Sequence, residues 1–236
     1  MIDTLTYSQR EDLHGKYDDL IKSKLDTQKV AEEAGEPFND PKLINTIGRL
    51  ILDIGNNIPR YNTILNDTNY TNLLSEIICG ISKIKNNEDG QRIIALPEDY
   101  KEGEIFDTAL SKILNPESGP KLGKVLYITG KISSGNSIKA VLDYMDKEEI
   151  YYNVASLFIE ENFLDPIQNH QKGFNAFNSE LFYGEISESD TFKINEEKVG
   201  HDKYPFLKVE NAEEEWSIRS ARNSVNVVAK YLSELI

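Results

Sequence analysis

The sequence contains little cysteine and little histidine. Among its 236 residues Cys79 is the one cysteine, so an internal disulfide cannot form, which fits a reducing compartment. Cys79 stands on or near an apolar helical stripe, and we expect it to be a buried structural thiol. The histidines His14, His170 and His201 stand far apart, without the spacing of a metal-ligand motif. We therefore expect no metal site built from these residues.

Long hydrophobic runs are also missing. No apolar run approaches the roughly 20 residues that a membrane-spanning helix needs. The first residues, Met1 to Thr4, do not begin the positively charged and then apolar stretch of a signal peptide. We therefore expect a cytoplasmic protein that does not contact a membrane.

Basic residues are few relative to acidic ones. The sequence has 26 lysines and arginines against 40 aspartates and glutamates, and its net charge is −14. Because nucleic acids attract broad basic surfaces, we expect no direct binding of DNA or RNA. The acids are scattered in short groups, which favours a role in solubility. An acidic surface that docks on a basic protein partner is the second interpretation.

Apolar residues at helical spacing dominate residues 1–90, which we assign to a helical N-terminal part. The spacing predicts one helix over about 8–34 and another through 73–84. Between them, Pro41 is expected at the first position of a helix that Asp40 caps. A polar turn then ends this part of the chain.

The pattern changes in residues 91–236, where short apolar runs alternate with helical segments. Strands are predicted at 92–96, 124–128 and 151–159, helices at 105–114 and 137–145, and weaker strands at 181–183, 192–194 and 206–209. Strands alternating with helices imply a parallel sheet with right-handed crossovers. We therefore expect an α/β fold, with a small parallel sheet beside the helical N-terminal part.

The last segment of the chain predicts a further helix. Apolar residues from Ile218 to Leu235 recur in steps of three and four, which forms one apolar seam. Such a seam usually packs in a core, and Trp216 is expected to anchor the helix. A homodimer through this helix is the alternative.

The segment from Lys124 to Tyr144 carries the one pattern with chemical content. A hydrophobic strand runs into a loop of glycines and small hydroxyl residues, and a helix follows directly. At the carboxyl end of a parallel strand this arrangement aims backbone N–H groups at one point, which attracts phosphate. The alternative is an ordinary turn with a serine cap. The candidate phosphate- or nucleotide-binding residues are Thr129, Gly130, Lys131, Ser133, Ser134, Gly135, Asn136 and Ser137.

The loop resembles those of two protein families, and the first is the P-loop NTPases. Residues Gly130 to Ser137 fit their G-x-x-x-x-G-K-[ST] pattern, except that Asn136 stands where a lysine contacts the terminal phosphates. About a hundred residues follow the loop, which is short for an NTPase core, and a predicted strand precedes it. A degenerate P-loop nucleotide-binding protein is therefore kept as an alternative.

The loop resembles that of the type I phosphoribosyltransferases more closely. Their phosphoribosyl-pyrophosphate loop has four hydrophobic residues, two acids, two variable residues, then Asp-Thr-Gly-x-Thr and a helix. Ser134, Gly135 and Ser137 match the Thr-Gly-x-Thr phosphate cradle, with serine in place of threonine. The resemblance covers about residues 92–160. It implies a phosphoribosyltransferase-like sheet that binds a nucleotide or a phosphosugar.

The acidic positions of that loop depart from the family. Thr129 and Gly130 replace the paired acids that hold the ribose hydroxyls, and Ser133 replaces the acid that follows. Without these carboxylates nothing in the segment holds Mg²⁺, so the cofactor stays unknown although Mg²⁺ is compatible with such a ligand. The best remaining carboxylates are Glu160 and Glu161, at the end of a predicted strand.

The pyrophosphate loop of the family would follow the strand at 92–96. Its usual Arg-Gly-Gly is absent, unless Lys101 and Gly103 take its place. The resemblance therefore implies a phosphoribosyltransferase-like protein that binds its ligand with lost or altered catalysis; if it is active, it is a glycosyl transferase. An acidic interaction or regulatory protein on an inactive scaffold is the alternative.

Overall fold

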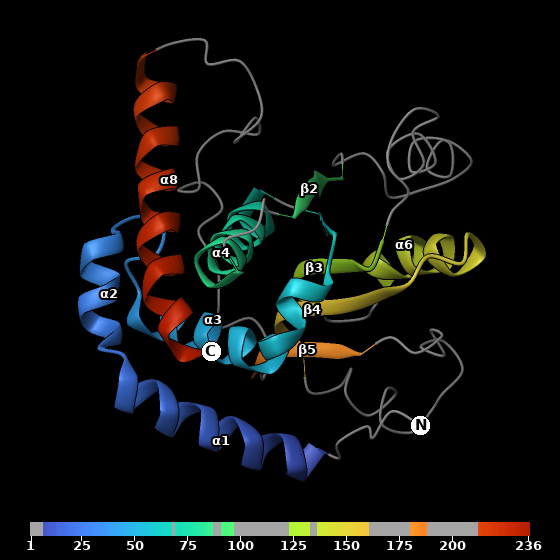
Figure 1. The fold of residues 1–236 in the computed structure, drawn as a ribbon, viewed down its shortest axis with the longest axis horizontal. Helices are drawn as coiled ribbons and strands as arrows, with labels where there is room; N and C mark the ends of the chain where they lie inside the picture. Colours follow the sequence, from blue (N-terminus) through green and yellow to red (C-terminus); the bar gives the residue numbers. More distant parts are fainter. Residues whose placement is uncertain are drawn as a thin grey trace.

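The structure, a computed structural model, describes residues 7–67, 69–86, 91–96, 123–132, 136–160, 180–187 and 212–236. It contains a five-stranded, all-parallel sheet in the order β2-β1-β3-β4-β5 (Figure 1). The strands are β1 (Thr63–Asn66), β2 (Arg92–Ala95), β3 (Val125–Ile132), β4 (Tyr152–Glu160) and β5 (Leu181–Ser187). The α helices are α1 (Tyr7–Lys24), α2 (Thr27–Ala34), α3 (Pro41–Ile54), α4 (Asn69–Asn86), α6 (Asn136–Lys147) and α8 (Ala212–Leu232), with 3₁₀ helices η1 (Gly55–Arg60) and η3 (Ser233–Leu235). The predicted α/β fold with N-terminal helices is confirmed.

Described helices cover both faces of the sheet. On one face Ile64, Leu126 and Ile128 pack in a core with α3, α4 and α8, which the N-terminal helices also join. On the other face Leu65 and Tyr127 pack against α6. Figure 1 shows α2 and α8 at one side of the molecule and α6 at the opposite side. β1, β3 and β4 are buried on both faces along most of their length, which explains their apolar runs, whereas β2 at the edge of the sheet is largely exposed.

The prediction of one helix over residues 8–34 is wrong at its middle. The chain forms α1 and α2 instead, and Asp26 separates them. The Asp26 carboxylate accepts a hydrogen bond from the backbone N–H of Lys29 at 3.1 Å, so it caps α2. The predicted cap of α3 is confirmed: Asp40 accepts from the Lys42 N–H at 2.8 Å, with Pro41 in the first turn.

The prediction that residues 1–90 are helical is wrong at β1. Thr63–Asn66 form a strand that pairs with β2 on one side and β3 on the other. All four residues of β1 are buried, so apolar and polar residues do not alternate along it as they do in a half-buried strand. So short a segment cannot be told from part of a buried helix by its pattern alone. The boundary at residue 90 stays a prediction, but β1 and α4 precede it and belong to the sheet layers.

The other predicted strands agree in position with β2, β4 and β5, and the helix at 137–145 agrees with α6. β3 is longer than predicted, because its pairing with β4 continues to Ile132 and Ile159. The helix at 105–114 and the strands at 192–194 and 206–209 lie outside the described residues. In the described part of the chain, no helix has the length and apolar character needed to cross a membrane.

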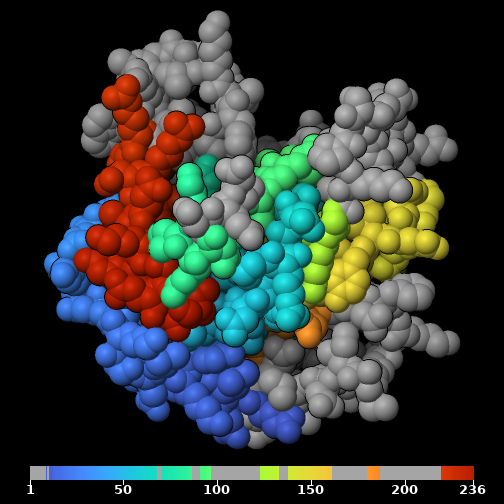
Figure 2. All heavy atoms as spheres, in the orientation of Figure 1, coloured from blue at the N-terminus to red at the C-terminus, as the bar shows by residue number. Residues whose placement is uncertain are grey.

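The apolar seam of α8 is buried inside the chain. Val225, Val228 and Leu232 lie in the core that α2 and α4 share with the sheet. In Figure 2, α8 lies in red against the blue N-terminal helices. Core packing therefore accounts for the seam, and a homodimer through α8 stays a prediction that would need another face of this helix.

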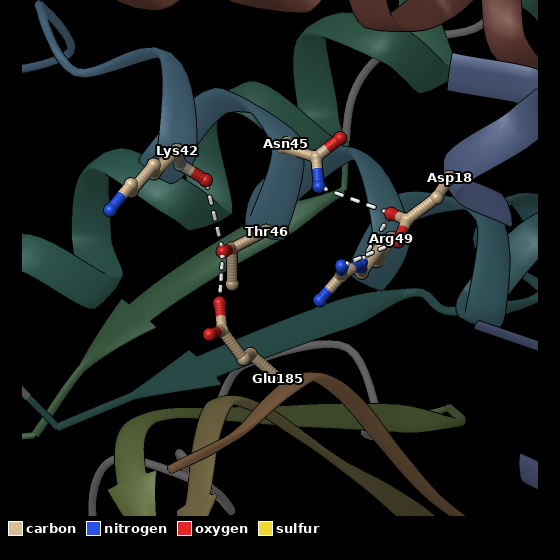
Figure 3. Close-up of polar contacts among 6 residues, drawn as sticks. All are labelled: Asp18, Lys42, Asn45, Thr46, Arg49 and Glu185. Carbon is tan, nitrogen blue, oxygen red and sulfur yellow. Dashed lines mark hydrogen bonds and ion pairs between the residues drawn. The ribbon is translucent and has the colours of Figure 1, made fainter. Parts of the chain in front are cut away.

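A polar cluster fastens α1 and β5 to α3 (Figure 3). The Arg49 guanidinium donates to both carboxylate oxygens of Asp18, at 2.6 and 2.7 Å, and Asn45 donates to Asp18 at 3.1 Å. Directly after Asn45 on α3, the Thr46 hydroxyl donates to Glu185 of β5 at 2.7 Å. Planar, bidentate pairs of this kind fix orientation as well as position. α3 therefore serves as the element on which the N-terminal helix is oriented.

Replacing Asp18 by asparagine is expected to cost about 1 kcal/mol at pH 7, as for a well-formed, partly exposed pair. Burial acts to raise the pKa of Asp18, but hydrogen bonds from Arg49 and Asn45 outweigh it and hold the pKa below its ordinary value. The stabilisation is therefore present above the ordinary aspartate pKa and lost as pH falls through the lowered one. Urea unfolding of the wild type, Asp18→Asn and the exposed control Asp19→Asn at pH 7, 5 and 3 measures it. A difference independent of pH would contradict this account.

Candidate functional site

The chain moves across the sheet in opposite directions from β1 to β2 and from β3 to β5, so the strand order changes direction between β1 and β3. β2 lies on one side of β1, whereas β3, β4 and β5 follow on the other side. α4 and α6 accordingly cover opposite faces, as right-handed crossovers running in opposite directions require. In open α/β sheets, ligands bind outside the carboxyl ends of the strands at such a reversal. The candidate site therefore lies at the carboxyl ends of β1 and β3.

The predicted phosphate loop follows β3 at this edge. Thr129, Gly130 and Lys131 belong to β3 itself, so the prediction that the loop begins after Ile128 is wrong. The pattern misled because a glycine inside a strand weakens it and often marks a bulge or a bend. The strand, loop and helix nevertheless occur in the predicted order.

The residues of the loop proper connect β3 to α6. Ser133, Ser134 and Gly135 lie outside the described residues. Asn136 and Ser137 begin α6, a helix of 12 residues, and only their backbone is described. Their role in binding phosphate stays a prediction. The first backbone N–H groups of α6 lack partners within the helix, as in any helix, and provide the donors that an anion would use.

The Asp67 carboxylate contacts Thr129, which stands at one of the positions where the resemblance expects an acid. Asp67 follows β1 directly, and its Oδ2 accepts hydrogen bonds from the hydroxyls of Tyr127 and Thr129, both at 3.0 Å. A longer contact of 3.4 Å joins Oδ1 to the Thr71 hydroxyl of α4. Thr129, where the resemblance expects an acid, is buried and donates to an acid from the neighbouring strand. The sheet thus supplies a carboxylate that the loop sequence lacks.

The environment of Asp67 disfavours its charge. Burial raises the pKa of this carboxyl, and the hydrogen bonds from Thr129, Tyr127 and Thr71 lower it by less. In the described part of the chain no lysine, arginine or histidine forms an ion pair with Asp67. A partly buried carboxyl with a raised pKa at the ligand-binding edge of a sheet is typical of a functional group.

Polar side chains behind Asp67 fix the start of α4 against β1. Asn66 donates to Asn72 at 3.3 Å and to Ser75 at 3.2 Å, and all three side chains are buried. The Ser75 hydroxyl donates in turn to the Thr71 carbonyl at 2.7 Å. The carbonyl oxygen of the Asn66 amide has no partner among the described residues. These hydrogen bonds hold the first turns of α4 against the end of β1, and thereby fix the positions of Asp67 and Thr71.

Lys131 and Glu160 form an ion pair at the carboxyl ends of β3 and β4. The Lys131 ammonium lies 2.7 Å from the Glu160 carboxylate, and both side chains are partly exposed. The predicted cation Lys131 and the predicted acid Glu160 are therefore paired with each other in the structure. Glu161, the other predicted carboxylate, lies outside the described residues.

The remaining candidates show structural roles. Cys79 is half-buried, its thiol contacts the Gln91 carbonyl at 3.7 Å, and burial raises its pKa to about 12, which favours the expected structural role. The His14 ring packs edge-on against Tyr183, with centroids 4.8 Å apart. His170 and His201 are not described. Within the described ranges no three histidine, cysteine, aspartate or glutamate side chains gather as a metal site would need.

The fold and the site define a class, an α/β protein whose parallel sheet has helices on both faces and polar side chains where the strand order changes direction. No protein-family model, no curated protein and no solved structure matches the chain. The function therefore has to be argued from the site.

Proposed function

We propose that this protein binds a nucleotide or a phosphosugar at the carboxyl edge of the sheet, through the loop between β3 and α6. One observation carries the proposal: this loop follows the central strand, beside the reversal of strand order, and leads directly into a helix. Ligands of doubly wound sheets bind at that position, and helix N-termini favour anions. The resemblance to the type I phosphoribosyltransferases supports the same ligand class.

In this proposal the backbone of the loop and of the first turn of α6 holds a phosphate group. Gly135 lets the backbone approach it closely, and the loop serines donate hydroxyl hydrogen bonds. Lys131 adds positive charge once it is released from Glu160. The output is regulation or an altered glycosyl chemistry, since the acids that would hold a ribose are absent from the loop.

The strand order changes one part of the resemblance. Loops that share one ligand with the β3 loop should follow a neighbour of β3, and β1 separates β2 from β3. The segment after β2, with Lys101 and Gly103, is therefore the poorer candidate for a second phosphate contact.

Calorimetric titration with phosphoribosyl pyrophosphate, nucleoside monophosphates and ATP, each with and without Mg²⁺, tests the proposal. Saturable binding of any of them supports it. Preference for phosphoribosyl pyrophosphate favours the phosphoribosyltransferase-like interpretation. Preference for ATP favours a degenerate P-loop, for which the central position of β3 is also suitable. No binding by the folded protein would reject the proposal in favour of an acidic interaction protein.

The ion pair between Lys131 and Glu160 provides a second test. Glu160→Gln is expected to tighten binding of the phosphate ligand about three- to tenfold, because the lysine then has no competing carboxylate. Lys131→Ala is expected to weaken it about tenfold. Lys83→Ala, an exposed lysine near the opposite end of α4, is the control. Unchanged affinity in both test variants would exclude Lys131 from the phosphate site.

A further inference from the structure

Helix α1 is attached to the rest of the protein with little buried surface. Among its described side chains Ile21 is the one that is buried, whereas α3 buries eight of its 14 residues. Gly15 also stands inside α1, where glycine weakens a helix. Elements with few buried apolar contacts open at a lower free energy than the core does. α1, which Figure 1 shows at the rim of the molecule, therefore has the features of a helix that opens separately.

The chain can bend between α1 and α2 without disturbing α2. α1 ends at Lys24 and α2 begins at Thr27, and Asp26 between them caps α2 through its own carboxylate. The cap of α2 thus does not depend on α1. Leu25 is buried in the core and anchors the chain beside this cap. A rotation of α1 about these two residues would expose Ile21 and leave α2 in place.

Arg49 of α3 faces two acids from different elements, and Figure 3 shows its guanidinium between their carboxylates. It donates to both oxygens of Asp18 on α1, at 2.6 and 2.7 Å. Glu185 of β5 accepts a hydrogen bond from Thr46 at 2.7 Å. The hydrogen bonds to Asp18 raise the pKa of Arg49, burial lowers it by less, and the charges of Asp18 and Glu185 raise it further. One cation thus has a bonded acid on the N-terminal helix and a second acid on the sheet.

The second acid lowers the cost of losing the first. Removing one partner of a desolvated ion pair is normally costly, because the other charge is left uncompensated. If α1 moves away with Asp18, Arg49 keeps Glu185 as its counter-charge. Charge-assisted hydrogen bonds between a guanidinium and a carboxylate are strong, so the arginine would then bind this acid directly.

We propose that α1 is a strap that opens as one unit, and that Arg49 transfers from Asp18 to Glu185 when it opens. The transfer takes Glu185 away from Thr46 and so loosens α3 on β5, the last strand of the described sheet. The position of α1 is thereby coupled to the packing of this strand. The inference does not depend on the proposed phosphate site.

Native-state amide hydrogen exchange of the full chain tests the opening, under conditions where exchange reports the opening equilibrium. In the wild type, the amides of α1 between Leu13 and Ser23 are expected to exchange about tenfold or more faster than those of α3, with one shared opening constant. This measurement needs no variant. Equal protection of α1 and α3 would overturn the strap.

Glu185→Gln tests the transfer. Glutamine can still accept the hydrogen bond from Thr46, but it is a poor partner for Arg49 once Asp18 has left. Opening should become rarer, so exchange in α1 is expected to slow about threefold or more while exchange in α3 does not slow. Glu148→Gln, at an exposed glutamate of α6, is the matched control and should leave α1 within about twofold of the wild type.

Asp18→Asn should act in the opposite direction. It weakens the closed state alone, so exchange in α1 is expected to rise about fivefold. A Glu185 side chain that served only to pack α3 on β5 would instead give faster exchange in both helices when it is replaced by glutamine. That result, or unchanged exchange of α1 in Glu185→Gln, would overturn the proposal.

Discussion

Replacing Gly135 by aspartate is expected to lower the affinity for phosphate-bearing ligands by about 100-fold or more, because like charges brought together cost several kcal/mol. Gly135 immediately precedes α6 in the sequence. Aspartate at the start of a helix is a favourable cap and suits the helix dipole. The variant should therefore fold as well as the wild type while it places a negative charge where the proposal places a phosphate.

Gly135→Asn is the matched control for Gly135→Asp. Asparagine has the same size and also caps helices, but it carries no charge. Its affinity should fall less than that of the aspartate variant, by the steric part of the effect only. Calorimetry with phosphoribosyl pyrophosphate and ATP measures both. Equal binding by the wild type and Gly135→Asp would show that phosphate does not bind at this loop.

Replacing Gly184 by alanine is expected to destabilise the protein by about 2–4 kcal/mol, in the range of severe overpacking. Gly184 brings β5 against α3. An added Cβ would lie 2.6 Å from the Thr46 carbonyl oxygen and 2.9 Å from that of Leu157. Both atoms belong to the backbone of packed elements, so α3 and the sheet would have to separate. The same shift would strain the hydrogen bond between Thr46 and Glu185.

Gly15→Ala provides the opposite control. Gly15 lies within α1, and an added Cβ there meets no atom within 4 Å. Alanine should stabilise this helix by about 0.5–1 kcal/mol, because glycine loses more backbone entropy on folding. Urea unfolding of the two variants and the wild type measures both effects. A Gly184→Ala midpoint equal to that of the wild type would contradict the close packing of α3 on β5.

The sequence predicted those elements whose signals are local. α3 carries a cap, a proline and a long apolar stripe, and β4 is a long apolar run. α6 follows a loop of small residues and alternates apolar and polar positions at helical spacing. Each signal lies within one segment, so it can be identified without knowledge of its neighbours.

The elements missed by sequence depend on contacts with distant residues. β1 has four residues, and its identity as a strand comes from pairing with β2 and β3 on both sides. The break before α2 was missed for a different reason. Asp26 is a local cap signal, but it stands inside an apolar periodicity that continues across it.

The candidate site divides in the same way. The strand, loop and helix around residues 125–147 could be predicted, because their order in the sequence is their order in the structure. Asp67 could not, because its contact with Thr129 spans 62 positions and exists only once β1 and β3 pair. An apolar pair followed by Asn66 and Asp67 was the one available signal, and it is common at the ends of strands.

The central claim is that phosphate binds at the carboxyl edge of the sheet, where β3 leads into α6. Amide chemical-shift mapping on the isotopically labelled full chain tests it most directly, with phosphoribosyl pyrophosphate and ATP as the probes. The account predicts saturable shifts concentrated between Ile132 and Ser137, with a weaker set at Asp67. Absence of shifts, or shifts confined to α1 and α8, would contradict it.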